Sequence, residues 1–158
     1  MALNLHAVVR GAIQSVNPDV SGWWYRSAGS VANPDGRQVP AFQAAVSVML
    51  QVQPPSARDL RFMEYMQMQG VIRTVYMYSN PEGIVRVNQT GNDLLLFPQW
   101  AGGANDTWLV ERPDESFNVD SGGWTKLYAT LQTDRAYSVM DGSGRLVLDA
   151  DGRIVRTQ

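Results

Sequence analysis

Short runs of alternating apolar and polar residues recur between residues 42 and 132, and they constrain the fold more than any other feature of the sequence. The clearest is SGGWTKLYATLQ at residues 121–132. One set of alternate positions holds Trp124, Lys126, Tyr128 and Thr130, and the other holds Thr125, Leu127, Ala129 and Leu131. Because successive side chains of a β-strand point to opposite faces, this run predicts a strand whose two faces meet different surroundings.

Five other runs have the character of strands: residues 46–53, 71–79, 83–89, 94–98 and 107–112. Turn signals such as NPEG at 80–83 and TGND at 90–93 separate them at intervals of about ten residues, the spacing typical of all-β proteins. The predicted fold is therefore mainly β, a small barrel or sandwich of about six antiparallel strands.

Two helices and a C-terminal extension complete the predicted architecture of this 158-residue, single-domain chain. An apolar stripe over residues 3–16 predicts an N-terminal helix, which either covers one end of the sheet or docks on a neighbouring subunit. Ser56 and Asp59 form a capping-box pattern that predicts a short inserted helix. We assign residues 1–132 to the β-barrel domain and residues 133–158, with turn signals DGSG and DADG, to a β-hairpin extension that needs a surface to lie on.

Composition argues against several classes of protein. The net charge is −2, with no block of like charge, whereas non-specific nucleic-acid binders usually carry a basic patch. The chain has no cysteine, so disulfides and thiolate chemistry are excluded. The N-terminal residues are typical of a helix rather than a signal peptide, and no run is long and apolar enough for a membrane span.

The sequence contains no pattern that predicts catalysis, a metal or a cofactor. P-loop and dinucleotide-binding patterns are missing, and the single histidine, His6, lies in the predicted N-terminal helix. The aspartates of DGSG and DADG are better explained by turns than by calcium, because one loop has Arg145 at a ligand position. We therefore expect no enzymatic activity and no cofactor.

Clustered aromatic and methionine residues are the candidate contact residues. Trp23, Trp24 and Tyr25 are adjacent, so an extended backbone places at least one of them away from the core. Met66 and Met68 follow the inserted helix, and methionine suits both core gaps and adaptable partner surfaces. For both groups, internal packing and partner contact remain open at this point.

The order of these segments resembles a family of viral structural proteins. It runs from a helix ending in VNP through PAFQAAVSVMLQVQPPSARDL, QGVIRTVYM and GIVRVNQTGNDLLLFP to TWLVER and GWTKLYATLQ. It is similar to small proteins encoded among the head and tail genes of tailed bacteriophages and prophages, more broadly the head–tail joining proteins: stopper, head-completion or collar components of the neck. The resemblance covers about residues 3–132, and its motifs are structural patterns.

The resemblance implies a function and partners. Such proteins are small β-barrels with a helix and long loops, and they form a closed ring in the virion between the portal or adaptor protein and the tail or next neck protein. Genomic DNA passes through the ring without specific binding. We therefore expect Trp124 and Tyr128 to support a subunit or portal contact, although Trp124 fits a plug of the barrel end equally well. We expect loops 99–107 or 112–123 to line or plug the channel, with candidate residues Trp100, Asn105, Asp114 and Glu115.

Two alternatives remain at the level of the sequence. Residues 133–158 extend past the end of the family pattern, which favours a tail terminator or a tail or baseplate-attachment subunit if the extension pairs with a partner's sheet edge. A carbohydrate-binding β-domain would use Trp23, Trp24 and Trp100 as stacking platforms.

Overall fold

The architecture of the chain comes from a computed structural model that describes residues 15–65, 70–78, 91–117, 124–132, 139–143 and 145–156. Strands dominate these residues, as the sequence predicts. In chain order the elements are β1 (Val20–Tyr25), β2 (Ser27–Ala32), β3 (Gln38–Phe42), β4 (Val46–Gln53), α2 (Ala57–Tyr65), β5 (Ile72–Met77), β6 (Leu94–Pro98), β7 (Asn105–Phe117) and β8 (Trp124–Leu131).

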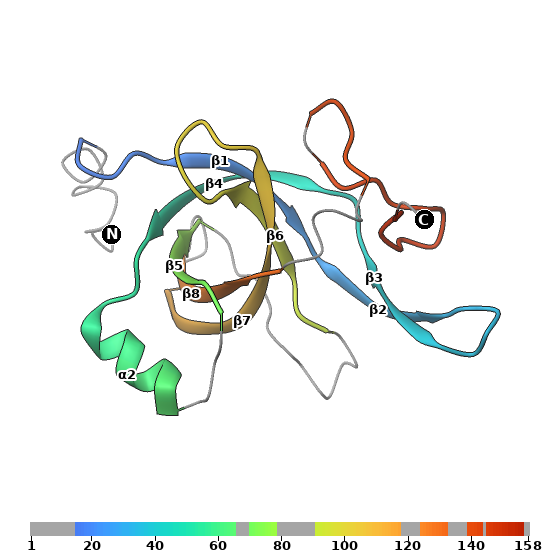
Figure 1. Ribbon diagram of the computed structural model, residues 1–158, viewed down its shortest axis with the longest axis horizontal. Helices are drawn as coiled ribbons and strands as arrows, with labels where there is room; N and C mark the ends of the chain where they lie inside the picture. The colour runs from blue at the N-terminus through green and yellow to red at the C-terminus, as the bar shows by residue number, and fades with distance from the viewer. Residues whose placement is uncertain are drawn as a thin grey trace, which may run out of the picture.

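Six of these strands form a closed antiparallel barrel in the order β1-β4-β5-β8-β7-β6 (Figure 1). Closure depends on β1, which pairs with β4 along one side and with β6 along the other. The β1–β6 register joins Trp23 to Leu96, Trp24 to Leu95 and Tyr25 to Leu94. A closed barrel leaves none of its strands with an unpaired edge, which removes the usual route to edge-to-edge association.

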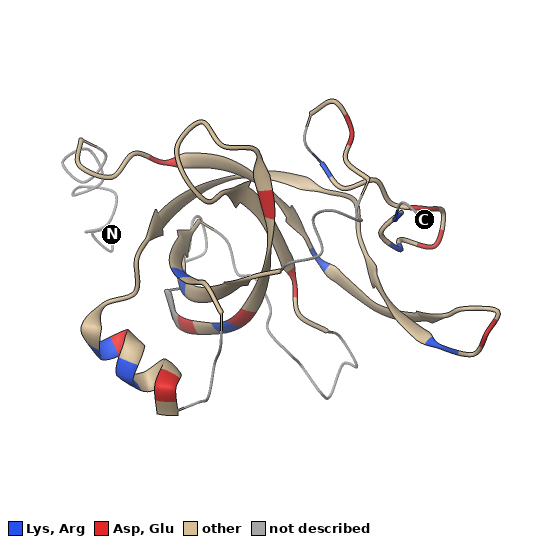
Figure 2. Ribbon diagram, viewed as in Figure 1, with Lys and Arg blue, Asp and Glu red and all other residues tan. Residues whose placement is uncertain are grey.

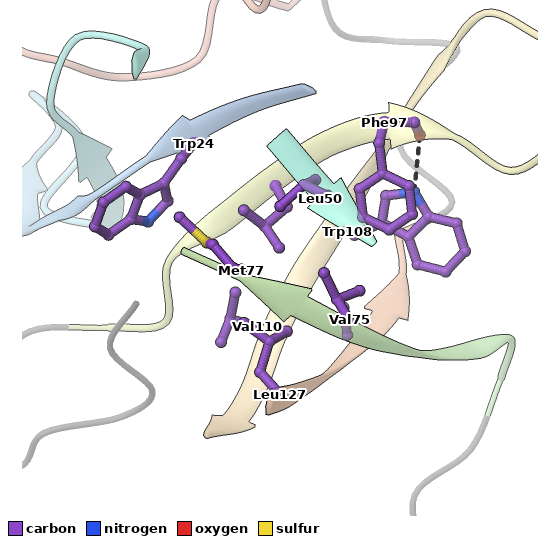
Figure 3. Packing of buried hydrophobic residues seen from close by; sticks show 10 residues of the cluster. Trp24, Leu50, Val75, Met77, Phe97, Trp108, Val110 and Leu127 are labelled. Atoms are coloured by element: carbon purple, nitrogen blue, oxygen red, sulfur yellow. Dashed lines mark hydrogen bonds between the residues drawn. The ribbon is translucent and has the colours of Figure 1, made fainter. Parts of the chain in front are cut away.

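The barrel interior is filled by side chains from all six strands (Figure 3). Its aromatic members are Trp24, Trp108 and Phe97, and the rings of Trp108 and Phe97 stack with centroids 4.7 Å apart. The indole Nε1–H of Trp108 donates to the Phe97 carbonyl oxygen at 3.0 Å, so the buried polar atom of the tryptophan is satisfied. The interior is therefore a packed core.

The predicted strands at 46–53, 71–79, 94–98, 107–112 and 124–131 correspond to β4, β5, β6, β7 and β8. The sixth barrel strand is β1, which contains the adjacent aromatics Trp23, Trp24 and Tyr25. The predicted strand at 83–89 lies outside the described residues, and so does the predicted N-terminal helix except for its last two positions, which belong to a turn. The short inserted helix is confirmed as α2.

A two-stranded arm extends from the barrel (Figure 1). It consists of β2 and β3, which pair with each other. Along the chain, β2 follows the barrel strand β1, and β3 precedes the barrel strand β4. The turn at its tip is closed by hydrogen bonds between Asn33, Gly36 and Arg37. The residues NPDG, at positions 33–36, thus form the end of this arm.

The C-terminal residues do not form the predicted ladder of a two-stranded hairpin in their described part. They contain two isolated bridges, Met140 to Leu146 and Leu148 to Ile154. The sequence repeats with a period of eight, VMDGSGRL followed by VLDADGRI. This repeat places three valines at equivalent positions, and their backbones form a cyclic set of bonds: Val139 N–H to Val155 O, Val155 N–H to Val147 O, and Val147 N–H to Val139 O, each 2.9 Å.

Each octad also forms the same turn. Asp141 accepts the backbone N–H groups of Ser143 and Arg145 and pairs with the Arg145 side chain at 2.7 Å. Asp149 makes the equivalent bonds one octad later, with the Arg153 side chain at the same distance. These backbone and side-chain bonds lower the pKa of both carboxyl groups below its usual range. The aspartates are therefore turn residues, as the sequence indicates.

The described C-terminal residues, 139–143 and 145–156, pack on the outer face of the barrel, where β1 and β6 contribute to a second apolar cluster. Tyr25, Phe42, Leu94, Leu96 and Leu146 are its buried members. This is why β6 is buried on both faces: Leu95 and Phe97 point into the barrel, whereas Leu94 and Leu96 point under the C-terminal residues.

A substitution at Gly22 tests how closely β1 approaches β6. A Cβ atom there would lie 2.5 Å from the Leu96 carbonyl oxygen and 3.0 Å from Cδ1 of Leu50. We expect Gly22→Ala to lower the free energy of unfolding by about 1–3 kcal/mol through overpacking, measured by urea denaturation. Gly142→Ala is the control, because its Cβ would meet nothing within 4 Å. Equal stabilities for the two variants would contradict this closure of the barrel.

Candidate functional site

The outer face of β8 carries the candidate site. The predicted two-faced strand is confirmed, because Leu127 and Ala129 lie in the barrel core while Lys126 and Tyr128 bond to groups outside it. Thr130 also faces outward and donates to Glu111 on β7. The outward side chains of β8 are thus engaged within the chain itself.

Helix α2 covers this face, and its first turn fixes how it does so. Asp59 N–H donates to Ser56 Oγ at 3.2 Å, while the Asp59 carboxylate accepts the Ser56 N–H at 3.0 Å and the Ser56 hydroxyl at 2.7 Å. This is a reciprocal capping box, with Asp in the position that Glu usually takes. The box holds Asp59 on the buried side of α2 together with Met63.

Lys126 lies between two carboxylates. Its ammonium group is 3.2 Å from Asp59 Oδ1 on α2 and 2.8 Å from Asp114 Oδ2 on β7. The Tyr128 hydroxyl lies 2.6 Å from the same Asp59 oxygen and 3.0 Å from the same Asp114 oxygen. We call these four side chains the Lys126 cluster; it joins α2, β7 and β8, and Figure 2 shows the charged residues on α2 and on the adjacent part of β7.

Within the cluster, the pKa values of Asp59, Lys126 and Tyr128 move in the direction that preserves the protonation state expected at neutral pH. Burial alone would raise the pKa of Asp59, but hydrogen bonds from Tyr128, Ser56 and Lys126 outweigh it and hold that pKa well below its usual range. Burial alone would lower the pKa of Lys126, but its bonds to Asp114, Tyr128 and Asp59 raise it above its usual range. Burial and the bond to Asp59 both raise the pKa of Tyr128.

These shifts favour a structural role for the cluster over acid–base chemistry. A general acid or base works best when its pKa is near the working pH, and a lysine nucleophile needs a lowered pKa. The neighbouring pocket, about 390 Å³ in volume, is lined mainly by polar and charged side chains, including Arg58 and Arg112. Its aromatic lining residues are Phe62 and Tyr128, and the Arg112 guanidinium lies 5.2 Å from the centroid of the Phe62 ring.

The described part of the chain contains no group of three or more potential metal ligands among His, Cys, Asp and Glu. Nor does it contain a helix long and apolar enough to cross a membrane.

Three of the predicted contact residues are buried within the chain: Trp24, Tyr25 and Tyr128 are each 3% exposed or less. Their side chains therefore pack within the chain, which is one of the two possibilities that the sequence leaves open for Trp24 and Tyr25. Trp24 points into the barrel, where its indole N–H donates to Asp93 at 2.9 Å. Tyr25 points the other way, and its hydroxyl donates to the Leu146 carbonyl at 3.0 Å. Burial raises the pKa of Tyr25 to about 12.

The remaining aromatic candidates keep some exposure. Trp23 is half-buried beneath the Arg145 guanidinium, which lies 5.3 Å from its ring centroid. Trp124 is half-buried, with its ring centroid 6.1 Å from that of Tyr76. Met66 and Met68 lie outside the described residues.

Three of the four predicted channel residues lie on β7, and the fourth, Trp100, lies in the turn before it. Trp100 is 64% exposed in the β6–β7 turn, and Asn105 is the first residue of β7. Asp114 belongs to the Lys126 cluster, and Glu115 is opposite Lys126 in the β7–β8 register. Residues 112–117 are thus strand rather than loop, and the rest of the predicted loop, 118–123, lies outside the described residues.

Sequence reasoning assigned no site role to Asp59 or Lys126. Two signals were available: the capping box, which fixes the orientation of Asp59, and the position of the single lysine on the same strand face as Tyr128.

No known family model matches the chain, and no curated protein gives a significant match.

Removing the lysine charge tests the Lys126 cluster. We expect Lys126→Met to lower the free energy of unfolding by about 3 kcal/mol at neutral pH, because Asp59 and Asp114 would keep their charges without a counter-ion in a partly buried site. Arg37→Met is the control: Arg37 and Asp35 are 85% and 56% exposed, and such a surface pair contributes at most about 1 kcal/mol. A loss no larger than that of the control would contradict the assigned role.

The same comparison has a defined pH dependence. Because the pKa of Asp59 is lowered in the folded state, its carboxylate stabilises the fold at pH values above its unfolded-state pKa, which is near 4. This stabilisation is lost as the pH falls through the folded-state pKa. The raised pKa of Lys126 stabilises the fold below its unfolded value near 10.4, and this contribution is lost as the pH rises through the folded pKa. The difference in the free energy of unfolding between wild type and Lys126→Met should be constant from about pH 5 to 9 and should become smaller outside that window.

Proposed function

We propose that this protein is a structural subunit of the neck of a tailed-phage particle. It forms a closed ring with further copies of itself between the portal or adaptor protein and the tail or next neck protein. The genome passes through the ring without specific binding, and the protein's place is in the virion. This proposal rests first on the order of sequence motifs that resembles the head–tail joining proteins.

The Lys126 cluster is the structural observation that supports it best. Asp59 and Lys126, whose pKa values are among the most strongly shifted of the described residues, connect helix α2 to the barrel, and both shifts favour the charged forms that pair in this contact. This arrangement fixes the position of the helix on the barrel. A ring subunit needs a fixed shape, because small errors in the angle between neighbours accumulate around the ring and prevent closure.

The distribution of parts around the barrel also supports the proposal. A heterologous ring needs two different surfaces on each subunit that fit each other. The arm formed by β2 and β3, the C-terminal residues and the β6–β7 turn carrying Trp100 give the outer surface several unlike features (Figure 1).

The two alternatives gain less support from the described residues. Leu146 and its neighbours pack against the chain's own barrel, which does not favour an extension reserved for a tail partner. Trp24 is buried, Trp23 lies under Arg145 and Trp100 is exposed on a turn, so the three tryptophans do not form one stacking platform for a sugar.

Deleting the gene from a phage or prophage genome that encodes it tests the proposal. We expect electron micrographs of the lysate to show heads and tails that have not joined, and heads that have lost their DNA, because the joining ring is missing. Supplying the gene from a plasmid should restore joined, infectious particles. Normal joined particles that retain their genome without the protein would refute a neck function.

A further inference from the structure

A small pocket lies where the arm, the outer face of β6 and β7, and the C-terminal residues meet. Its volume is about 180 Å³, and its apolar walls include Phe42, Leu94, Leu109 and Ile154. Sites for small molecules usually measure about 300–1,000 Å³. This pocket is smaller, and it suits a single inserted side chain of the kind that anchors protein interfaces.

One polar group in this pocket lacks a partner. Thr107 lines it and is only 8% exposed, yet its hydroxyl has no hydrogen-bond partner among the described residues. The side chain belongs to the outer face of β7, because its neighbour Trp108 occupies the barrel interior. Leaving a buried hydroxyl unpaired is unfavourable, so this atom indicates that the pocket's natural occupant brings a hydrogen-bonding group.

Trp100 has the matching chemistry. It is 64% exposed, and the turn that presents it is closed by the bond from Gly103 N–H to the Trp100 carbonyl at 3.0 Å. An indole is a large apolar group with one donor and no acceptor, which suits an apolar pocket containing one unpaired hydroxyl. Large exposed aromatics are also the side chains that most often dominate binding energy at interfaces.

Trp100 does not line the pocket of its own chain, and its side chain is 64% exposed. It follows the end of the β6–β7 hairpin where Pro98 pairs with Asn105, whereas the pocket runs from Thr107, two positions from Asn105 on β7, to the pair Leu94 and Leu109, four positions away. These separations correspond to about 7 Å and about 13 Å along the strands. Knob and pocket are therefore different surfaces of one subunit.

We propose that Trp100 of one copy inserts its indole into this pocket of the next copy, with Nε1–H donating to Thr107 Oγ1. Because the two surfaces differ, the contact is heterologous, and its repetition gives a ring or an open filament. That this contact joins neighbouring copies in the neck ring rests on the proposed function.

A mixing experiment by NMR tests the contact even if it is weak. The observed species is ¹⁵N-labelled Trp100→Ala protein, which keeps the pocket and lacks the knob. Unlabelled wild-type protein, added up to about 1 mM so that a dissociation constant near 1 mM is detected, should shift the amide signals of Thr107, Leu109 and Ile154. Unlabelled Trp100→Ala should produce no such shifts. Unlabelled Tyr65→Ala is the matched control: Tyr65 is 85% exposed but lies on α2, so its loss should leave the shifts as they are with wild type.

Removing the acceptor provides the second arm. Thr107→Val, introduced into the labelled protein, keeps the side-chain shape and removes the unpaired hydroxyl. We expect the melting temperature to stay the same or rise, because the free chain loses no hydrogen bond. The affinity for the wild-type knob should fall about threefold to tenfold, as for one lost hydrogen bond. If the Thr107 hydroxyl acted only in folding, Thr107→Val would not lower the affinity while leaving the melting temperature unchanged or raised.

The proposal is overturned if no pocket signal moves at the highest concentration, or if knobless protein shifts the same signals as wild type. Such a result would leave the neck function standing on the gene deletion, with the ring built by another contact. Conversely, the expected shifts combined with normal particles after deletion would establish this self-association and refute the neck function.

Discussion

The pairing of β1 with β6 is the constraint on which the rest of the structure depends. It joins an N-terminal strand to one from the middle of the chain and turns an open sheet into a barrel. Asp93 secures the junction: immediately before β6, it accepts the Trp24 indole N–H at 2.9 Å and the Ser27 backbone N–H at 2.8 Å. One buried carboxylate thereby ties the core, the end of β1 and the start of the arm together. Gly22 lets the backbones approach closely enough for this arrangement.

Closure also makes the outer face of the barrel a platform. Helix α2 is attached by the Lys126 cluster, an electrostatic contact between helix and strands. The C-terminal residues are attached by apolar burial around Leu146 and by the bond from Tyr25. The arm needs no separate attachment, because its strands continue the path of β1 and β4. A rigid body carrying several unlike surfaces is what repeated head-to-tail contact requires, and this links the fold to the proposed ring.

Most of the barrel could be predicted from the sequence, because alternation and turn chemistry are local signals. The capping box at Ser56 fixed the start of α2 for the same reason. The burial of Tyr25 could not be predicted, since its cover comes from Leu146, more than a hundred residues away. The role of Lys126 likewise depends on tertiary contacts with Asp59 and Asp114. The octad repeat was readable in the sequence, but its two turns suggest an ordinary hairpin unless they are compared at a spacing of eight residues.

Amide hydrogen exchange, resolved by residue, tests the closed barrel most directly. If β1 closes the sheet, the amides that bridge β1 and β6 open only with the whole core. Their protection should then equal that of core amides such as Val75 and Leu127, which are fully buried. Exchange of the β1 and β6 amides that is orders of magnitude faster than that of Val75 and Leu127 would show that the sheet is open, and it would contradict the account.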